Sequence, residues 1–191
     1  MIYGKYVALR PMEDGDQDFI HALNEDPVVR GRVVGWDWPS SAHNQKALFS
    51  ASASGGATHR WVVVDPEGRS VGLTGLWDVD WHNRHAMTAL KLGGPNPLRG
   101  KGLGTDAIMT VMAFAFYDVG LHRLYGSILT DNIASQRAYV TKCGWSVEGT
   151  SRSHIWRHGS FIDLLQVGVL KDDFDALPDS QSYVELVING R

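Results

Sequence analysis

The stretch that decides the fold reads Arg99-Gly-Lys-Gly-Leu-Gly-Thr105, between an expected strand at residues 85–92 and an expected helix at residues 105–118. At the start of a helix several backbone N–H groups lack acceptors, and the helix dipole favours an anion there. Glycines let the backbone approach that anion closely. The spacing of Arg99, Gly102 and Gly104 therefore predicts a loop that holds a pyrophosphate without magnesium.

Two better-known phosphate loops do not fit this stretch. A Walker loop would need glycine where Pro95 stands and serine or threonine where Gly102 stands. A dinucleotide-binding loop would need its third glycine at Thr105, and no suitable acidic residue follows. A glycine-rich turn without a ligand remains an alternative at this point.

The elements around the loop indicate a mixed α/β chain. The next expected strand, residues 123–129, completes a βαβ unit, so it should lie parallel to the strand at 85–92 with a right-handed crossover. Further expected elements are a strand at 6–10, a helix that begins near Asp14, a second helix after Ser40, a hairpin of 60–64 with 71–77, a helix from Asn132 to Gly144, and strands at 145–155 and 161–170.

Composition predicts an ordinary globular protein. The 191 residues are 43% hydrophobic and 20% charged with a net charge of −3, which gives no basic footprint for nucleic acid. The single cysteine, Cys143, excludes an internal disulfide. The first residues do not look like a signal peptide, and no apolar run reaches the roughly 20 residues that cross a bilayer. We therefore expect a cytoplasmic protein with neither membrane nor nucleic-acid partners.

Several motifs in order resemble the GNAT acetyltransferase superfamily, in particular the branch with the ribosomal-protein N-terminal alanine acetyltransferases. They are Val7-Ala-Leu-Arg-Pro11, Val71-Gly-Leu-Thr-Gly-Leu-Trp77, the loop at 99–104, Asn132-Ile-Ala-Ser-Gln-Arg-Ala-Tyr139 and Arg157-His-Gly-Ser-Phe-Ile-Asp163. The resemblance covers residues 6–170 and implies a single domain over 1–191 with a C-terminal tail at 171–191. It implies an α+β fold: a mostly antiparallel twisted sheet, one central parallel pair splayed around acyl-CoA, and helices on both faces.

The resemblance also implies acetyl-CoA, or another acyl-CoA, as co-substrate. The loop would hold its pyrophosphate, the strand before the loop would pair with the pantetheine arm, and Asn132 would both cap its helix and contact the arm. We expect a bulky side chain at Gly104 to occupy the anion site. The expected cofactor-binding residues are Leu90, Lys91, Leu92, Arg99, Gly100, Lys101, Gly102, Leu103, Gly104, Thr105, Asn132 and Ser135.

Tyr139 is the candidate general acid by resemblance, with Ser135 as its deputy, because residues 132, 135 and 139 share a helix face. A core aromatic remains the alternative reading of Tyr139. The chain has one more residue between Tyr139 and Gly144 than the family spacing, so we expect either a local bulge or a shifted helix end, and either would rotate Tyr139 from its usual direction. Many relatives carry a glutamate base where we align Met87, which leaves Asp80, Asp78 or Asp163 as substitutes.

The acceptor is expected to be a primary amine, either a protein N-terminus or a small molecule such as a polyamine. Candidate substrate-binding residues, chosen as aromatic and imidazole side chains in loops, are Trp36, Trp38, Trp77, His82 and His85. A metal in the segment 78–85 is disfavoured because the reaction needs none. The expected function is amine acylation by direct attack, and the alternative is a non-catalytic acyl-CoA sensor. An exposed apolar tail at 183–188 suggests a homodimer.

Overall fold

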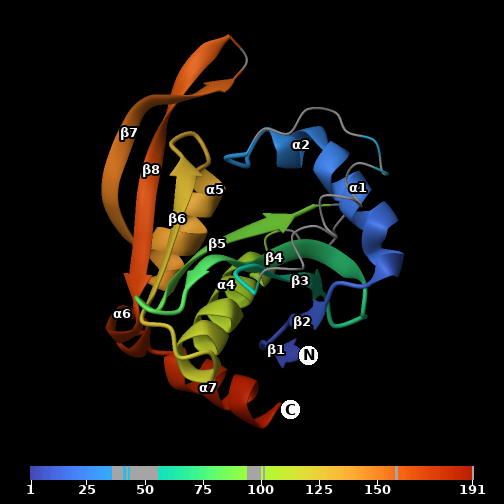
Figure 1. Ribbon diagram of the computed structural model, residues 1–191, viewed down its shortest axis with the longest axis vertical. Helices are drawn as coiled ribbons and strands as arrows, with labels where there is room; N and C mark the ends of the chain where they lie inside the picture. The colour runs from blue at the N-terminus through green and yellow to red at the C-terminus, as the bar shows by residue number, and fades with distance from the viewer. Residues whose placement is uncertain are drawn as a thin grey trace.

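The computed structural model of the chain describes residues 1–35, 41, 43, 56–93, 100, 102–157 and 159–190. These residues form one eight-stranded sheet in the order β1-β2-β3-β4-β5-β6-β8-β7, in which the neighbours β5 and β6 are parallel and the other pairs antiparallel (Figure 1). The strands are β1 Ile2–Tyr3, β2 Ala8–Pro11, β3 His59–Val64, β4 Ser70–Asp80, β5 His85–Leu92, β6 Arg123–Leu129, β7 Ser146–Arg157 and β8 Ser160–Leu170.

Helices cover both faces of the sheet, as expected. They are the short 3-10 turn η1 Asp14–Asp16, α1 Gln17–Glu25, α2 Pro27–Arg30, α4 Leu103–Ala113, the π-helix η2 Phe114–Asp118, α5 Ile133–Gln136, the π-helix η3 Arg137–Lys142, α6 Lys171–Asp175 and α7 Ser180–Asn189. The larger buried cluster joins α4 and α7 to one sheet face, and a smaller cluster with Leu23 and Val29 joins α1 and α2 to the other.

Local chemistry explains the elements that the sequence predicts well. The hairpin of β3 and β4 turns at Asp65, whose side chain accepts hydrogen bonds from the backbone N–H groups of Glu67 and Arg69. The βαβ unit is also confirmed, because β5 and β6 run parallel with α4 between them in the chain. The early strand begins at Ala8, two residues later than expected, and ends at Pro11, since the backbone N–H groups of Tyr6 and Val7 donate instead to the Asp106 side chain on α4.

The C-terminal tail corrects the sequence analysis. The apolar segment at 183–188 is not an exposed tail but part of helix α7, in which Tyr183, Val184 and Val187 are buried in the main core beside α4 (Figure 1). Their period of three to four residues matches one helix face. The surface that suggested a homodimer is therefore largely covered by the chain itself, and the homodimer stays a prediction without that support.

Candidate functional site

The parallel strands β5 and β6 separate within the sheet. Their pairing ends at Met87 and Tyr125, so residues 88–92 of β5 have no strand partner on the β6 side. Leu90 and Leu92 point to the core beside α4, whereas the Lys91 side chain donates to Asn24 of α1 on the opposite face. Ala89, in the middle of an eight-stranded sheet, is exposed. The opening therefore leaves this stretch of β5 without strand pairing on the β6 side and accessible from the α1 face.

Helix α4 starts beside this opening. Its N-cap is Gly102, with φ +90°, and no side chain caps the first turn. The first backbone N–H that bonds back to the cap belongs to Asp106, so the preceding N–H groups remain available to an anion. Gly100, with φ +86°, also lies in the left-handed region. These features fit the pyrophosphate expected from the sequence, while Arg99 and Lys101 lie outside the described residues.

Gly104 has a packing role that the sequence did not suggest. A side chain there would point to Leu92, whose Cδ1 would lie 3.3 Å from the added Cβ, and to Leu90 at 3.8 Å. The missing side chain thus lets the helix start pack closely on β5, and the part of Gly104 in the anion site stays a prediction. Leu103 is buried in the core, and the Thr105 carbonyl accepts a weak hydrogen bond from the Cys143 thiol at 3.8 Å.

Replacing Gly102 with alanine is expected to weaken CoA binding by about 5- to 30-fold. The added Cβ meets no atom within 4 Å, but a left-handed conformation costs a non-glycine residue about 1–2 kcal/mol, and relaxation would move the N–H groups. Isothermal titration calorimetry measures the affinity. Gly68→Ala, at φ +78° in the distant β3–β4 turn, is the matched control for backbone strain. Equal CoA affinity in both variants would contradict the assignment of the loop.

Asn132 connects the opening to the N-terminal half of the chain. This buried residue caps α5 by accepting the Ser135 N–H at 3.2 Å, and its Nδ2 donates to the Arg32 carbonyl at 3.0 Å. The predicted cap is confirmed, and the second bond was not foreseen. Residues 31–35, here called the bridging segment, run from α2 toward α5 (Figure 1). Ser135 is half-buried on α5, and its role as an acid stays a prediction.

Arg157 holds the same bridging segment and was missed by the sequence analysis. It is the last residue of β7, only 8% exposed, and its Nη2 donates to the carbonyls of Val33 at 3.2 Å and Val34 at 3.3 Å. Its Nε is buried without a partner among the described residues. Arg157 is the first residue of the motif at 157–163, which was the signal available in the sequence. Its role could not be predicted because its partners lie more than 120 residues away along the chain.

We expect Arg157→Met to lower the free energy of unfolding by about 1–2 kcal/mol, because methionine fills similar space but leaves the carbonyls of the bridging segment without their charged donor. Urea denaturation measures the change. Arg152→Met, an exposed position on the same strand, is the control and should stay within about 0.5 kcal/mol of wild type. If the two variants unfold alike, Arg157 does not hold the segment.

Tyr139 lies in the π-helix η3, which supplies the bulge expected from the extra residue before Gly144. The wide turn is closed by the Trp145 N–H, which donates to the Tyr139 carbonyl at 3.2 Å. The Tyr139 ring packs edge-on against Trp145, with 4.9 Å between centroids, and is buried in the core. Burial raises its pKa far above the usual value, so the phenol keeps its proton.

Cys143 is buried one helical turn after Tyr139. Burial raises the pKa of its thiol to about 12, with a smaller opposing effect of Lys142. A thiol that stays protonated is a weak nucleophile. This agrees with acyl transfer that bypasses a cysteine.

Asp80 and His85 end β4 and begin β5, where they face each other across the hairpin. The Asp80 carboxylate accepts hydrogen bonds from the backbone N–H of Asn83 at 2.7 Å and from its side chain at 2.8 Å, and these bonds lower the pKa of Asp80. Its Oδ2 also lies 3.7 Å from His85 Nε2. A carboxylate with a lowered pKa is a weak base, so Asp80 is better suited to orient the imidazole.

The other predicted substrate residues divide between two places. Trp77 is paired with Met87, and its ring lies over Gly75, on the sheet face that carries α1. His82 is exposed at the turn between β4 and β5. Trp36 and Trp38 lie outside the described residues. The structure thus brings Trp77, Met87 and His85 to the face from which the opening is accessible.

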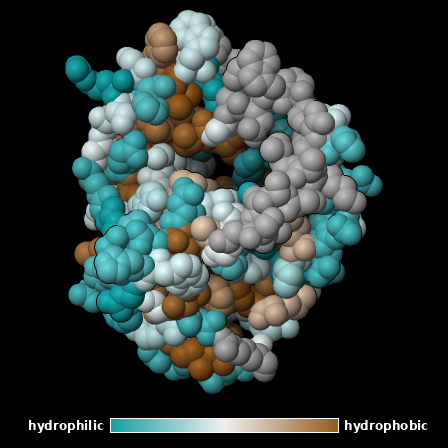
Figure 2. All heavy atoms as spheres, in the orientation of Figure 1, coloured by the Kyte–Doolittle hydropathy of each residue, from teal (hydrophilic) through white to brown (hydrophobic). Residues whose placement is uncertain are grey.

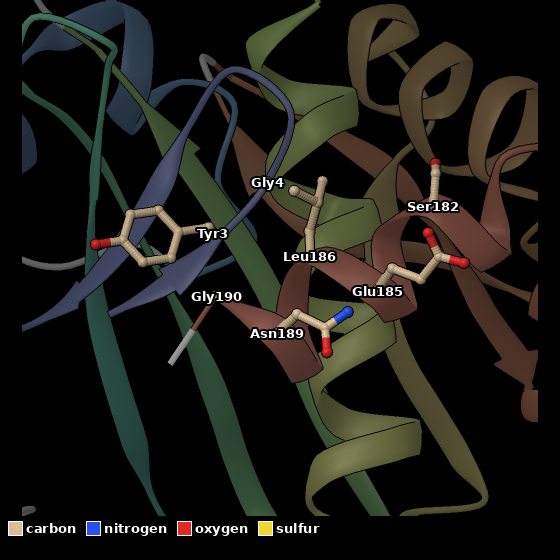
Figure 3. A pocket seen from close by; sticks show the side chains of 7 residues that line it. All are labelled: Tyr3, Gly4, Ser182, Glu185, Leu186, Asn189 and Gly190. Carbon is tan, nitrogen blue, oxygen red and sulfur yellow. The ribbon is translucent and has the colours of Figure 1, made fainter.

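Three further observations on the described residues add no residue to this site. No group of three or more His, Cys, Asp or Glu in the described part of the chain could hold a metal ion, and no helix there is long and apolar enough to cross a membrane. A groove of about 660 Å³ lies between β1 and α7, lined by Tyr3, Glu185, Asn189 and their neighbours (Figure 3). It is at the sheet edge away from β5 and β6.

Comparison with known proteins shows the family of the chain. The family model described as "Acetyltransferase (GNAT) domain" matches residues 7–146. The Bacillus subtilis protein named probable N-acetyltransferase YjcK is 31% identical over 182 residues, covering 91% of this chain and 98% of its own length. Spermidine N(1)-acetyltransferase of Vibrio cholerae is 24% identical over 170 residues, covering 88% and 95%.

A solved structure shows the same fold. It is spermidine N-acetyltransferase from Vibrio cholerae in complex with CoA and spermine, with a TM-score of 0.79 and 24% identity over 87% of this chain and 96% of that chain. The named relatives thus include spermidine acetyltransferases, which corrects the resemblance to the ribosomal-protein alanine branch. The superfamily that the motifs indicated is confirmed.

Proposed function

Because the chain belongs to the GNAT acetyltransferase family, we propose that it transfers an acetyl group from acetyl-CoA to a primary amine held in the same complex. The observation that carries this proposal is the opening between β5 and β6 beside the uncapped start of α4. The opening offers strand backbone to the pantetheine amides, and the helix start offers N–H groups to the pyrophosphate. In acetyl-CoA the pyrophosphate is joined directly to the pantetheine arm, so one molecule presents both groups next to each other.

Position supplies most of the rate in this proposal. The amine, once neutral, attacks the thioester carbonyl, and holding both reactants together removes the entropic cost of their encounter. A backbone N–H of β5 beside the opening stabilises the negative oxygen that develops on the carbonyl. The Tyr139 phenol, which burial keeps protonated, donates its proton to the departing thiolate.

The acceptor that we propose is a small polyamine of the spermidine type. Its support is the group of relatives named spermidine N-acetyltransferases, which match this chain over nearly its whole length. We place the acceptor on the α1 face, between the exposed Ala89 and the bridging segment. In that place Arg157→Met should raise the KM for the amine more than the KM for acetyl-CoA.

The test is a thiol-release assay of the purified protein with acetyl-CoA and a panel of amines. The panel contains spermidine, spermine, putrescine and short peptides with a free N-terminus. Release of CoA with spermidine or spermine, together with the acetylated product by mass spectrometry, supports the proposal. Turnover only with peptides would refute the polyamine assignment. Tight CoA binding without turnover of any amine would favour the acyl-CoA sensor, for which Met87 at the usual glutamate position is the one favourable observation.

A further inference from the structure

The reaction needs a base on the amine side, because a primary ammonium has no lone pair for attack. The residue aligned with the family's glutamate is Met87, which cannot accept a proton. Met87 lies between Trp77 on β4 and Tyr125 on β6 at the point where the parallel strands separate. A substitute base should therefore lie near this point and on the same sheet face.

His85 lies in that place. Residues two apart on a strand share a face, so His85 is on the face of Met87 and Ala89, about 7 Å along the strand from Met87. Its ring contacts the Tyr125 ring with 5.6 Å between centroids and an angle of 73°. Its side chain is 35% exposed, so water has access to part of the ring.

The two imidazole nitrogens have different surroundings. Nε2 lies 3.7 Å from Asp80 Oδ2, which favours a proton on Nε2. Nδ1 is buried and has no hydrogen-bond partner among the described residues. An unpaired buried nitrogen is costly unless something occupies it during function. With the proton on Nε2, Nδ1 is the atom that carries the lone pair.

The ring of His85 lies among acidic and neutral groups. The hairpin contributes Asp80 and Asp78, and β6 contributes the Tyr125 phenol, whose pKa is raised by burial and then by Asp78. The other neighbour on β6 is Arg123, paired with His85 across the strands, but its charge is balanced by a two-point ion pair with Glu148. The net surroundings of the imidazole are therefore acidic.

Backbone strain is concentrated in the same hairpin. Asp78 with φ +51° and Arg84 with φ +53° are two of the three non-glycine residues in the left-handed region among those the structure describes. Each such residue costs roughly 1 kcal/mol or more, and such strain is often found at functional sites. The hairpin that places Asp80 next to His85 therefore has a cost in conformational free energy, which agrees with a functional role for the geometry of this pair.

We propose that His85 is the general base of the reaction and that Asp80 is the residue that positions it. When the bound amine displaces the groups that cover His85 Nδ1, this nitrogen accepts one proton from the acceptor ammonium. The neutral amine then forms the N–C bond as the C–S bond breaks. The leaving thiolate takes the proton of the Tyr139 phenol, and the second proton of the amine restores that phenol. The proton on His85 passes to solvent. The products are the acetamide, CoA thiol and one proton.

This inference rests on the proposed function, and the experiment separates the two. The variants are His85→Ala, Asp80→Asn and, as a matched control, His154→Ala, an exposed histidine on β7. We expect His85→Ala to lower kcat/KM for the amine by about 10- to 100-fold, with CoA affinity unchanged by calorimetry. Added imidazole should restore part of the activity. Asp80→Asn should lower it by less, and His154→Ala should have no effect.

A second readout does not depend on turnover. Long-range 15N NMR of the imidazoles reports which nitrogen carries the proton. In the wild type we expect His85 as the Nε2–H tautomer, with Asp80→Asn losing that preference and His154→Ala keeping it. Activity in the wild type together with unchanged kcat/KM and no imidazole effect in His85→Ala would overturn the base assignment. No turnover of any amine by the wild type would instead overturn the proposed function.

Discussion

Tyr139→Phe is expected to lower kcat by about 10- to 1,000-fold while CoA affinity and the fold are retained, the range typical of the loss of one proton donor. Phenylalanine keeps the ring that packs against Trp145 but removes the hydroxyl. The loss should fall on kcat because negative charge develops on the sulfur only as the C–S bond breaks. Steady-state kinetics with saturating acetyl-CoA measure it.

Burial decides whether Tyr139 is suited to this role. Its raised pKa keeps the phenol protonated at every pH at which the protein would work, so a donor is always present. The same burial leaves open the reading of Tyr139 as a core aromatic, in which case the hydroxyl would contribute nothing to kcat. The substitution separates these readings because it changes one oxygen atom and no packing carbon.

Two companion variants sharpen the test. Tyr117→Phe removes the hydroxyl of an exposed tyrosine on η2 that bonds to Asp175 at 2.7 Å, and it should leave kcat within twofold of wild type. Ser135→Ala tests the deputy acid on α5. If Tyr139→Phe is active within twofold and Ser135→Ala is not, the acid is Ser135. If both remain active, the proton comes from water and neither residue is the acid.

Asp106→Ala should lower the free energy of unfolding by about 3 kcal/mol, a large share of the stability of a domain this size. The Asp106 carboxylate, 2% exposed, accepts hydrogen bonds from the backbone N–H groups of Lys5, Tyr6 and Val7 at 2.8–3.0 Å. It also accepts one from the Tyr183 hydroxyl at 2.6 Å. Alanine would leave all four donors without this acceptor.

Urea denaturation gives the free energy of unfolding for Asp106→Ala and two reference variants. Tyr183→Phe removes a single donor and should cost about 1 kcal/mol. Glu185→Ala, on the exposed face of α7, should stay within about 0.5 kcal/mol of wild type. A loss below 1 kcal/mol in Asp106→Ala would mean that the N-terminal segment does not depend on this carboxylate.

Much of the fold could be predicted from the sequence because its signals are local. The hairpin of β3 and β4 follows from a turn with Pro66 and Gly68 between apolar runs, and the βαβ unit follows from a glycine-rich loop between a strand and a helix. The cap at Asn132 and the bulge after Tyr139 also follow from spacing along the chain. In each case the residues that carry the signal, in a turn, a loop or a cap, lie within a few residues of one another.

The rest was decided by contacts between distant residues. Helix α7 has one apolar face, and that face is buried because it packs against α4. The contact includes a hydrogen bond from the Tyr183 hydroxyl to Asp106, which is 77 residues earlier in the chain. The roles of Arg157 and Asn132 depend on carbonyls of the bridging segment more than 90 residues away. The pairing of His85 with Asp80 needed the register of the hairpin, because a shift of one residue would place the imidazole on the opposite face. The sequence by itself determined the superfamily, the β3–β4 hairpin and the βαβ unit, since their signals depend on short-range backbone chemistry. Only the tertiary structure decided which side chains meet at the opening between β5 and β6, because such contacts depend on packing and not on spacing along the chain.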